Sequence, residues 1–463
     1  MSKNSINRRD FLSSAAVMGA AGTLGGGALL SSCGGGAKEP EMVPLRPVSE
    51  WNIAADSFPD KANDGRELKV GLVGCGGQGT GDLVNLLRVA DGIKVVALGD
   101  MFMDRIDDCR TRLKERANVE VPDEACFTGF DNYKKVIESD ADMILLVTAP
   151  AFRPLHFRAA VEAGKHVFME KPLAVDPVGV RSIMASARQA DTQGLCVING
   201  VQRHHQRSYN EAYKLVQAGM IGEIVSGNVY WNQSYLWHRD KDPRWTNMEW
   251  MIRDWVNWNW LSGDHIVEQH IHNIDVFNWF SHLKVESAVG FGSRQRRITG
   301  DQFDNFSIDY VYEGGVHVHS MCRQIDGCAN QNGERVLGTK GSVWTNQRGD
   351  AIITDLKGNE LWKYDIEKER EEYERVDPFA LQFVNWVNRI RSNNPINMAE
   401  ETAVSTMTAI MGRISAYTGA RVTWEDVMAM DMDLFPKDLE LSNVDLRDFP
   451  VPVPGRTRGE RRS

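Results

Sequence analysis

The first half of the chain alternates short apolar runs with segments of helical spacing. After the apolar run LKVGLV, for example, Leu83, Leu86 and Leu87 recur at the spacing of one helix face. Buried strands that alternate with helices are typical of a parallel sheet covered on both faces. The pattern therefore predicts an α/β fold with a doubly wound parallel sheet over residues 67–199, whose strands lie within segments 68–73, 93–100, 141–150 and 166–169.

The pattern changes near residue 200, where strand-like segments follow one another with glycine-bearing turns between them. This arrangement favours a mostly antiparallel sheet. We expect helices at 379–393 and 399–418 to complete a second α/β domain with an open sheet over residues 200–433. Residues 434–463 contain several prolines and are expected to form a surface arm. The predicted strands lie within segments 284–295, 304–325, 333–347 and 350–356.

The N-terminus resembles an export signal. The paired Arg8 and Arg9 precede a weakly apolar run, and Leu30-Ser31-Ser32-Cys33 has the form of a lipobox. A transmembrane anchor is the alternative, but glycines interrupt the run, which is too weakly apolar for a stable span. We expect residues 1–33 to be a twin-arginine signal, Cys33 to carry a lipid, and residues 34–66 to be a tether. The protein would then be periplasmic and would meet the membrane only through that lipid.

Composition limits the classes of partner. The 463 residues carry a formal charge of −10, and the last residues, RTRGERR, are the one basic tract that offsets it, so we do not expect a nucleic-acid partner. The apolar content of 42% is ordinary for a globular protein. None of the six cysteines after Cys33 has CxxC spacing. Cys322 and Cys328 could form a loop disulfide or remain two thiols.

A dinucleotide fingerprint stands at the exit of the first predicted strand, as Gly74-x-Gly76-x-x-Gly79. In such a turn the first glycine allows the tight bend, the second lets pyrophosphate approach the backbone, and the third packs the helix on the strand. Asp100 ends the next strand, where a ribose-binding carboxylate belongs. Its charge favours NAD over NADP, although Arg105 follows closely. Cys75, Gly77 and Gln78 lie in the same turn and are expected to contact the cofactor.

Residues 263–275, GDHIVEQHIHNID, hold three histidines and three acids. On one helix, His265, Glu268, His272 and Asp275 would share a face, and His270 would point elsewhere. The HExxH string of zinc proteases is absent from the sequence. The spacing alone leaves two interpretations open, a metal site and a proton relay.

The chain resembles the Gfo/Idh/MocA oxidoreductase family in several motifs. These are VGxGxxG at 73–79, Asp100, AGKHVFMEKPLAVD at 163–176, GMIGEI at 219–224 and the predicted helix at 263–275. The resemblance covers roughly residues 67–430. It implies an N-terminal Rossmann domain for NAD(P), a second domain that binds substrate and forms oligomers, and a homodimer or homotetramer.

The resemblance also implies residue roles. Lys171 matches the lysine of the EKP motif, and Glu268-x-x-x-His272 matches an acid-x-x-x-His pair, with Glu where Asp is commoner. His272 would be the base for a hydroxyl proton, Lys171 would hold the oxygen, Glu268 would orient His272 or contact substrate, and no metal would be needed. His270 stands where the family usually has glycine. Cofactor contacts are implied at Thr148, Pro150, His156, Glu170, Lys171 and Arg203.

Seven of the thirteen tryptophans fall between residues 231 and 260. Indole rings can stack on the apolar faces of sugars, or they can pack this insert. Trp237 and His238 are the better candidates for lining a substrate site, and His270 and Asp275 are weaker ones.

These features predict an NAD-dependent oxidoreductase that moves a hydride to or from a secondary hydroxyl of a sugar, glycoside or polyol. An NAD-dependent glycoside hydrolase that oxidises its substrate transiently is the alternative, and a non-catalytic sugar-binding lipoprotein is a third hypothesis. An exported nicotinamide enzyme must also retain its cofactor. We expect residues 44–64 and the arm after Leu434 to cover that cofactor.

Overall fold

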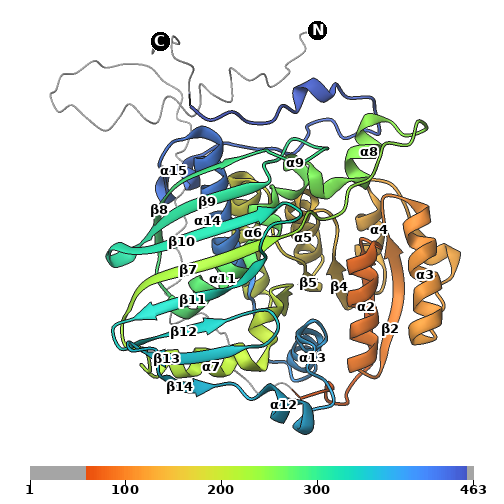
Figure 1. Cartoon of the computed structure of the whole chain (residues 1–463). Helices are drawn as coiled ribbons and strands as arrows, with labels where there is room; N and C mark the ends of the chain where they lie inside the picture. The colour runs from red at the N-terminus through yellow and green to blue at the C-terminus, as the bar shows by residue number, and fades with distance from the viewer. Residues whose placement is uncertain (1–58, 456–463) are drawn as a thin grey trace, which may run out of the picture.

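The computed structural model describes residues 59–455, which form two sheets joined through shared helices (Figure 1). The predicted export signal, Cys33 and most of the predicted tether lie outside the described residues. The first sheet has six parallel strands in the order β3-β2-β1-β4-β5-β6, and the second has nine strands, of which only β7 and β10 pair in parallel. The predicted fold class is confirmed: an α/β chain with a parallel Rossmann sheet and a mostly antiparallel second sheet.

The strands of the first sheet are short and almost wholly buried, as a parallel sheet covered on both faces requires. They are β1 (Leu68–Val73), β2 (Ile93–Gly99), β3 (Cys126–Phe127), β4 (Met143–Leu146), β5 (His166–Met169) and β6 (Val197–Asn199). One face packs on α4 (Asn132–Glu138), α5 (Arg153–Glu162) and α6 (Pro177–Thr192). The other face packs on α2 (Gly77–Val89), α3 (Met103–Ala117) and α13 (Pro378–Arg391).

The position of α13 differs from the expectation that it completes the second domain. Leu381, Phe383, Val384 and Trp386 of this helix are buried in the same hydrophobic cluster as α2 and β1. The helix therefore extends the helical layer of the Rossmann sheet, because its apolar face finds the uncovered strands β5 and β6 there.

The second sheet runs in the order β14-β13-β12-β11-β7-β10-β9-β8-β15. Its inner face packs on α7 (Arg207–Gln217), α11 (Ile271–Ser281) and α14 (Ala399–Thr418), whereas its outer face carries exposed apolar side chains, including Phe291 at 70% exposure. The strands are β7 (Ile224–Gln233), β8 (Val285–Ser293), β9 (Asn305–Tyr312), β10 (Val316–Gln324), β11 (Gln331–Gly338), β12 (Gly341–Thr345), β13 (Ala351–Asp355), β14 (Glu360–Lys363) and β15 (Val422–Thr423).

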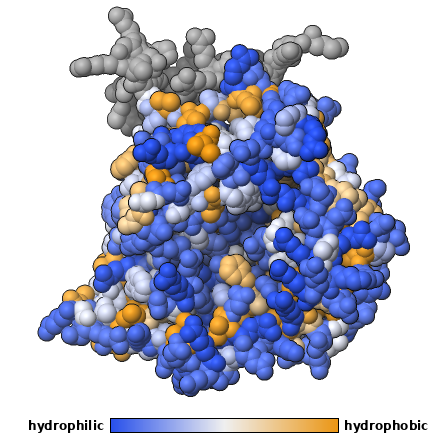
Figure 2. All heavy atoms as spheres, turned by 45° about the vertical axis from the view of Figure 1, so that its right-hand side comes forward, coloured by the Kyte–Doolittle hydropathy of each residue, from blue (hydrophilic) through white to orange (hydrophobic). Residues whose placement is uncertain are grey.

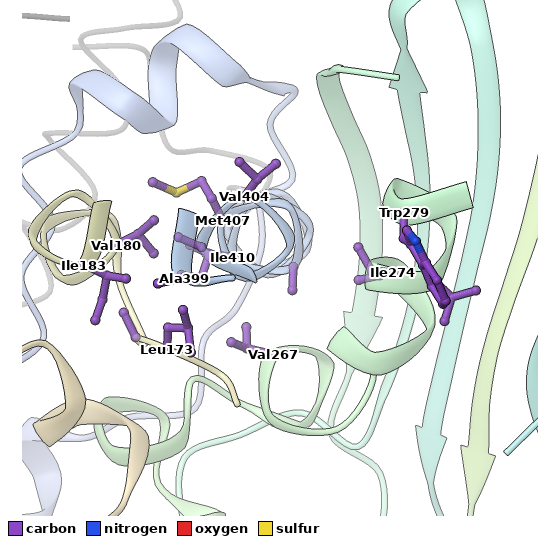
Figure 3. Close-up of a cluster of buried hydrophobic side chains, with 14 of the residues drawn as sticks. Leu173, Val180, Ile183, Val267, Ile274, Trp279, Ala399, Val404, Met407 and Ile410 are labelled. Carbon is purple, nitrogen blue, oxygen red and sulfur yellow. The ribbon is translucent and has the colours of Figure 1, made fainter. Parts of the chain in front are cut away.

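Helix α14 lies between the two sheets and joins them. Of its 20 residues, 19 are buried, from Ala399 to Tyr417. Figure 3 shows Met407 and Ile410 of this helix beside Val180 and Ile183 of α6, with Val267 and Ile274 on its other side. One hydrophobic cluster therefore runs from the Rossmann helices to the second sheet.

A third, smaller core lies at the carboxyl edge of the Rossmann sheet. It is formed by an insert with α8 (Asn247–Arg253), η5 (Trp255–Asn257) and α9 (Asn259–Ser262), and by the C-terminal arm after α15 (Trp424–Ala429), which contains η7 (Leu446–Asp448). The Met248 amide donates to the Ser442 carbonyl at 3.1 Å, and the Leu434 amide donates to Asp176 Oδ2 at 2.8 Å. The arm thus holds the insert against the loops that follow β4 and β5 (Figure 1).

The described part of the other predicted cover lies elsewhere. The Ala62 amide donates to the Val89 carbonyl at 2.8 Å, and the Asn63 amide donates to Asn388 Oδ1 at 2.7 Å. Both acceptors lie at the C-terminal ends of helices, α2 and α13. Helix α2 is about 20 Å long at 1.5 Å per residue, so Ala62 and Asn63 are remote from the glycine turn at its other end. For these residues the predicted cover is wrong.

Candidate active site

The glycine turn between β1 and α2 has the shape that a dinucleotide phosphate needs. Gly74 has φ of +103°, and a Cβ on Gly79 would lie 1.9 Å from the Gly74 carbonyl oxygen, so both positions exclude other residues. A Cβ on Gly76 or Gly77 would meet nothing within 4 Å. Helix α2 has no side-chain cap at Gly76, so the amides of its first turn, including that of Gln78, are free for an anion. These residues fit a pyrophosphate.

Asp100 lies beside this turn at the end of β2. Its Oδ2 accepts the Cys75 amide at 2.7 Å, and its Oδ1 accepts the Phe102 amide at 3.1 Å. Burial raises the pKa of Asp100, while the two amide bonds act in the opposite direction. Each carboxylate oxygen keeps a further lone pair for a ribose hydroxyl. Arg105, half-buried in the first turn of α3, favours the charged form of Asp100.

The predicted contacts after β4 form a supporting layer. His156 Nδ1 lies 3.3 Å from Thr148 Oγ1, and its ring stacks on Tyr133 with centroids 4.3 Å apart. Burial lowers the pKa of His156 to about 3, so the ring is neutral. Pro150 begins the short helix η3 (Pro150–Phe152) directly beyond Thr148. His156 therefore orients Thr148, which is the more exposed of the two.

Glu170 and Lys171 follow β5 at the same edge of the sheet. Glu170 Oε2 accepts the Lys171 amide at 3.0 Å, and the missing side chain of Gly200 leaves the space that this carboxylate fills, since a Cβ there would lie 2.3 Å from Oε1. Burial raises the pKa of Glu170, and the charges of Lys171 and Arg153 oppose that shift. Glu170 thus fixes the backbone from which Lys171 extends.

Lys171 and Glu268 join the two domains. Lys171 Nζ donates to Glu268 Oε1 at 3.0 Å and to the Glu268 carbonyl oxygen at 2.5 Å. Gln269 Nε2 donates to the other carboxylate oxygen at 2.5 Å. The side chains of Lys171 and Glu268 are only 11% and 8% exposed. The ion pair is therefore enclosed rather than a solvated surface contact.

His272 is the second residue of α11 (Ile271–Ser281) and lies four residues beyond Glu268. Its ring stacks on Trp231 of β7, with centroids 5.5 Å apart and planes at 21°. Among the described residues its Nδ1 is buried with no hydrogen-bond partner. Burial, followed by the positive charges of Lys171 and Arg203, holds the pKa of His272 well below its usual range. A neutral imidazole beside an ammonium group is competent to take a proton.

The segment that holds these groups is not one continuous helix. It is divided into α10 (His265–Glu268) and α11 (Ile271–Ser281), with Gln269 and His270 between them. Asp264 precedes α10 with φ of +69° and accepts the His265 amide at 2.5 Å. The predicted sharing of one helix face by His265, Glu268, His272 and Asp275 is therefore wrong.

Three of the predicted site residues, His270, Asp275 and Arg203, have structural partners, and so does His265 of the same segment. His270 Nε2 lies 2.6 Å from Ser320 Oγ. Asp275 accepts from His204 Nε2 at 2.6 Å and from Ser405 Oγ at 2.8 Å. Arg203 is 1% exposed and pairs with Glu334 at 2.5 Å, facing the second sheet. His265 Nδ1 pairs with Asp264 at 2.9 Å.

The tryptophans of the predicted cluster differ in burial: some pack the insert, and Trp237 is exposed. Trp258 and Trp260 are buried in the third core with Met248 and Met251. Trp237 is 41% exposed and meets Trp255 edge to face, and His238 is exposed beside it. Packing of the insert therefore accounts for part of the cluster and leaves Trp237 available to a ligand.

The insert also closes on the β2–α3 loop, which the sequence does not reveal. Arg253 of α8 donates to both carboxylate oxygens of Asp104, at 2.9 and 3.2 Å, and its guanidinium lies 3.7 Å from the centroid of the Phe102 ring. Phe102 is two residues beyond Asp100. Figure 2 shows the surface hollowed on this side of the molecule, with mostly hydrophilic residues around the hollow.

Residues 59–455 also bear on metal binding and on membrane insertion. Among these residues no cluster of three or more His, Cys, Asp or Glu side chains has a geometry that could hold a metal ion. Within the same residues, no helix combines the length and apolarity needed to cross a membrane. Cys322 is a buried free thiol and Cys328 an exposed one, so the possible disulfide between them is not formed.

The parallel sheet, the glycine turn and the enclosed Lys171–Glu268 pair define a dinucleotide-binding protein of the oxidoreductase class. Residues 68–199 match the model for the oxidoreductase family with an NAD-binding Rossmann fold, and residues 209–344 match the GFO/IDH/MocA C-terminal domain. The chain belongs to the Gfo/Idh/MocA family. Residues 5–25 match the twin-arginine translocation signal.

Individual relatives are distant. The chain is 25% identical over 250 residues to an inositol 2-dehydrogenase/D-chiro-inositol 3-dehydrogenase of Halalkalibacterium halodurans, which covers 54% of this chain and 63% of that protein. It is 25% identical over 315 residues to a glycosyl hydrolase family 109 protein of Shewanella pealeana, covering 66% and 64%. The chain thus spans just under two thirds of the length of both curated relatives.

A solved structure agrees with the fold. The scyllo-inositol dehydrogenase of Lactobacillus casei, with bound NAD(H) and scyllo-inositol, superposes with a TM-score of 0.58 at 20% identity. The superposition covers 77% of this chain and 99% of that one.

Proposed function

We propose that this protein is an NAD-dependent oxidoreductase that moves a hydride between a tightly held nicotinamide and a secondary hydroxyl of a sugar, glycoside or polyol. One observation carries the proposal. Lys171, just beyond the carboxyl end of β5, meets Glu268 of the second domain at 3.0 Å, and Glu268 is four residues before His272. Ligands of doubly wound sheets bind at this edge. An alcohol there would have an ammonium group and a neutral imidazole within reach.

The nicotinamide, when bound, accepts or returns the hydride. Lys171 binds the substrate oxygen that is bonded to the carbon giving or receiving the hydride. Its ammonium group has three N–H donors, of which Glu268 takes two, so one remains for the substrate oxygen. That charge stabilises the developing alkoxide during oxidation and polarises a ketone in the reverse direction.

His272 is the base for the hydroxyl proton. Because its pKa is depressed, the ring is unprotonated at neutral pH and remains so under mild acid. A weak base suffices here because Lys171 makes the bound hydroxyl more acidic. Glu268 holds the Lys171 side chain in place.

Export imposes a second requirement, retention of the cofactor. The twin-arginine route carries folded proteins, so the enzyme can leave the cytoplasm with its dinucleotide bound. We propose NAD rather than NADP, because the Asp100 carboxylate would repel a 2′-phosphate. We also propose lipidation at Cys33, which lies outside the described residues. A purified protein that carries near-stoichiometric NAD(H) and turns over with only a carbonyl acceptor would support retention; a cofactor-free protein that binds NAD weakly would contradict it.

The test of the oxidoreductase function is a panel of inositols, aldoses and glycosides with the purified protein. Formation of NADH is followed by absorbance, and the product is identified by mass spectrometry. Lys171→Met, which keeps the length of the side chain and removes its charge, should lose activity by about 10²-fold or more. Lys165→Met is the matched control, because Lys165 donates to the Ala141 carbonyl at 2.7 Å away from the site. Equal activity in the two variants would contradict the proposed role of Lys171.

A second candidate function is the NAD-dependent glycoside hydrolase. The similarity to the glycosyl hydrolase family 109 protein of Shewanella pealeana favours it. Such an enzyme oxidises the sugar, eliminates the aglycone and reduces the ring again, so it consumes no net NAD. Release of p-nitrophenol from a panel of p-nitrophenyl glycosides, without net NADH formation, would select this alternative.

A further inference from the structure

Trp231 lies against His272, although the sequence groups it with the tryptophans of the insert. It belongs to β7, on the face of the second sheet that packs against α11, and it is 7% exposed. Its indole is nearly parallel to the His272 ring, at 21°. The Arg203 guanidinium lies 5.5 Å from the centroid of the same indole. The indole therefore contacts both an imidazole and a permanent cation.

The other groups around His272 are mostly committed to partners. The Lys171 ammonium is paired with Glu268 of α10 at 3.0 Å, and the Arg203 guanidinium with Glu334 of β11 at 2.5 Å. The charged or titratable groups that act on His272 are Lys171 after β5, Arg203 and His204 in η4 (Gln202–His205), and His270 before α11; Glu268 of α10 is paired with Lys171. None of them gives His272 a carboxylate of its own.

The same chain contains an informative contrast. Trp279 stacks on His204 with centroids 4.2 Å apart and planes at 21°, but His204 Nε2 also meets Asp275 Oδ2 at 2.6 Å. That carboxylate gives the His204 ring a hydrogen-bond partner. His272 has the indole without the carboxylate. A proton placed on His272 would lie in a buried position near the positive charges of Lys171 and Arg203, and the indole face already interacts with Arg203.

We propose that Trp231 is a positioning residue for the reaction, which fixes the plane of the His272 ring and excludes water from it, so that the ring takes its proton from the substrate and not from solvent. This inference rests on the proposed function, in which His272 is the base. The Trp231 indole would act on the reaction only through the His272 ring.

The test measures the titration of His272 and the pH dependence of turnover in the cofactor-loaded protein. Histidine labelled at Cε1 gives one NMR signal for each ring, and His272→Asn identifies the signal of interest. Trp231→Ala removes the indole. Trp231→Gln replaces the indole by a polar amide and loses less side-chain volume than alanine does. Trp231→Phe keeps an aromatic face. Trp279→Phe is the matched control for loss of a buried indole stacked on a histidine.

In the wild type we expect His272 to stay neutral from pH 8 to pH 5. In Trp231→Ala or Trp231→Gln its midpoint should rise toward about 6.5, the value of a solvated imidazole. Turnover at pH 5 relative to pH 8 should then fall about thirtyfold below the wild-type ratio. Trp231→Phe should keep that ratio within about twofold, and Trp279→Phe should leave it unchanged.

Two results would overturn the inference. The first is an unchanged His272 titration in both Trp231→Ala and Trp231→Gln. The second is an equal shift in Trp279→Phe, which would indicate general loosening of the core. Failure of the proposed function is distinguishable, because a wild type that oxidises no polyol would remove the turnover measurement while the NMR titration still tests the contact of Trp231 with His272.

Discussion

Replacement of Arg253 by alanine should speed the release of the dinucleotide. Arg253 belongs to the insert, whereas Phe102 belongs to the loop that follows Asp100 and Asp104 to the first turn of α3. A cofactor whose ribose binds Asp100 would therefore lie beneath this contact. We expect release to require that the contact between the insert and the loop be broken.

The structure sets the size of the effect. The guanidinium donates to both oxygens of Asp104, at 2.9 and 3.2 Å, but Asp104 is 62% exposed, so this pair contributes only about 1 kcal/mol. Its position 3.7 Å above the Phe102 ring adds about 1 kcal/mol. Since 1.4 kcal/mol corresponds to a factor of ten, Arg253→Ala should raise the dissociation rate about thirtyfold.

The assay follows the fluorescence of bound NADH after mixing with excess NAD. Arg253→Lys keeps the charge and loses the planar fork, so its rate should fall between those of the wild type and Arg253→Ala. Arg244→Ala is the matched control, because Arg244 is 86% exposed and pairs with Asp242 within the insert. A dissociation rate in Arg253→Ala equal to that in Arg244→Ala would refute the reasoning that this contact limits release.

Three further predictions concern the site and the surface. His272→Asn should lower turnover by about 10²-fold or more with bound NAD retained, and the wild-type acid limb should lie below pH 6.5, because a base with a depressed pKa loses its proton at lower pH; a pH profile of kcat/KM checks both. Gly76→Ala should fold normally, because its Cβ meets nothing within 4 Å in the protein, yet lose NAD, because that Cβ occupies the space where pyrophosphate approaches the backbone. Gly79→Ala should unfold at lower temperature, because its Cβ would lie 1.9 Å from the Gly74 carbonyl oxygen. Calorimetry and NAD titration distinguish the two variants. From the family resemblance we propose that the protein is a homo-oligomer that uses the outer face of the second sheet, on which Phe291 is 70% exposed. Phe291→Glu should then reduce the mass measured by light scattering.

Local constraints made the Rossmann half readable from sequence. Gly74 and Gly79 must be glycine because the backbone leaves no room for a side chain, so the sequence itself marks these two positions. Asp100 could be placed because a strand end and a fixed interval locate it. Lys171 came only from the family motif, since a lysine after a strand has no signature of its own.

Contacts between distant segments were not predictable in the same way. Asp275 is three residues after His272, which would place both on one helix face, yet it pairs with His204, 71 positions earlier. The break between Glu268 and Ile271 has no proline or glycine to mark it. Trp231 looked like part of the insert because it is near the other tryptophans in sequence, whereas its strand pairing carries it to His272.

The central position of α14 limits how this molecule can open. A helix with 19 of 20 residues buried, packed on α6 of one domain and on α11 and β8 of the other, ties the two domains together within residues 59–455. Rotation of one domain against the other would break a single continuous hydrophobic cluster. The chain should therefore melt in one cooperative transition, and substrate and cofactor should enter through local movement of the insert and the C-terminal arm.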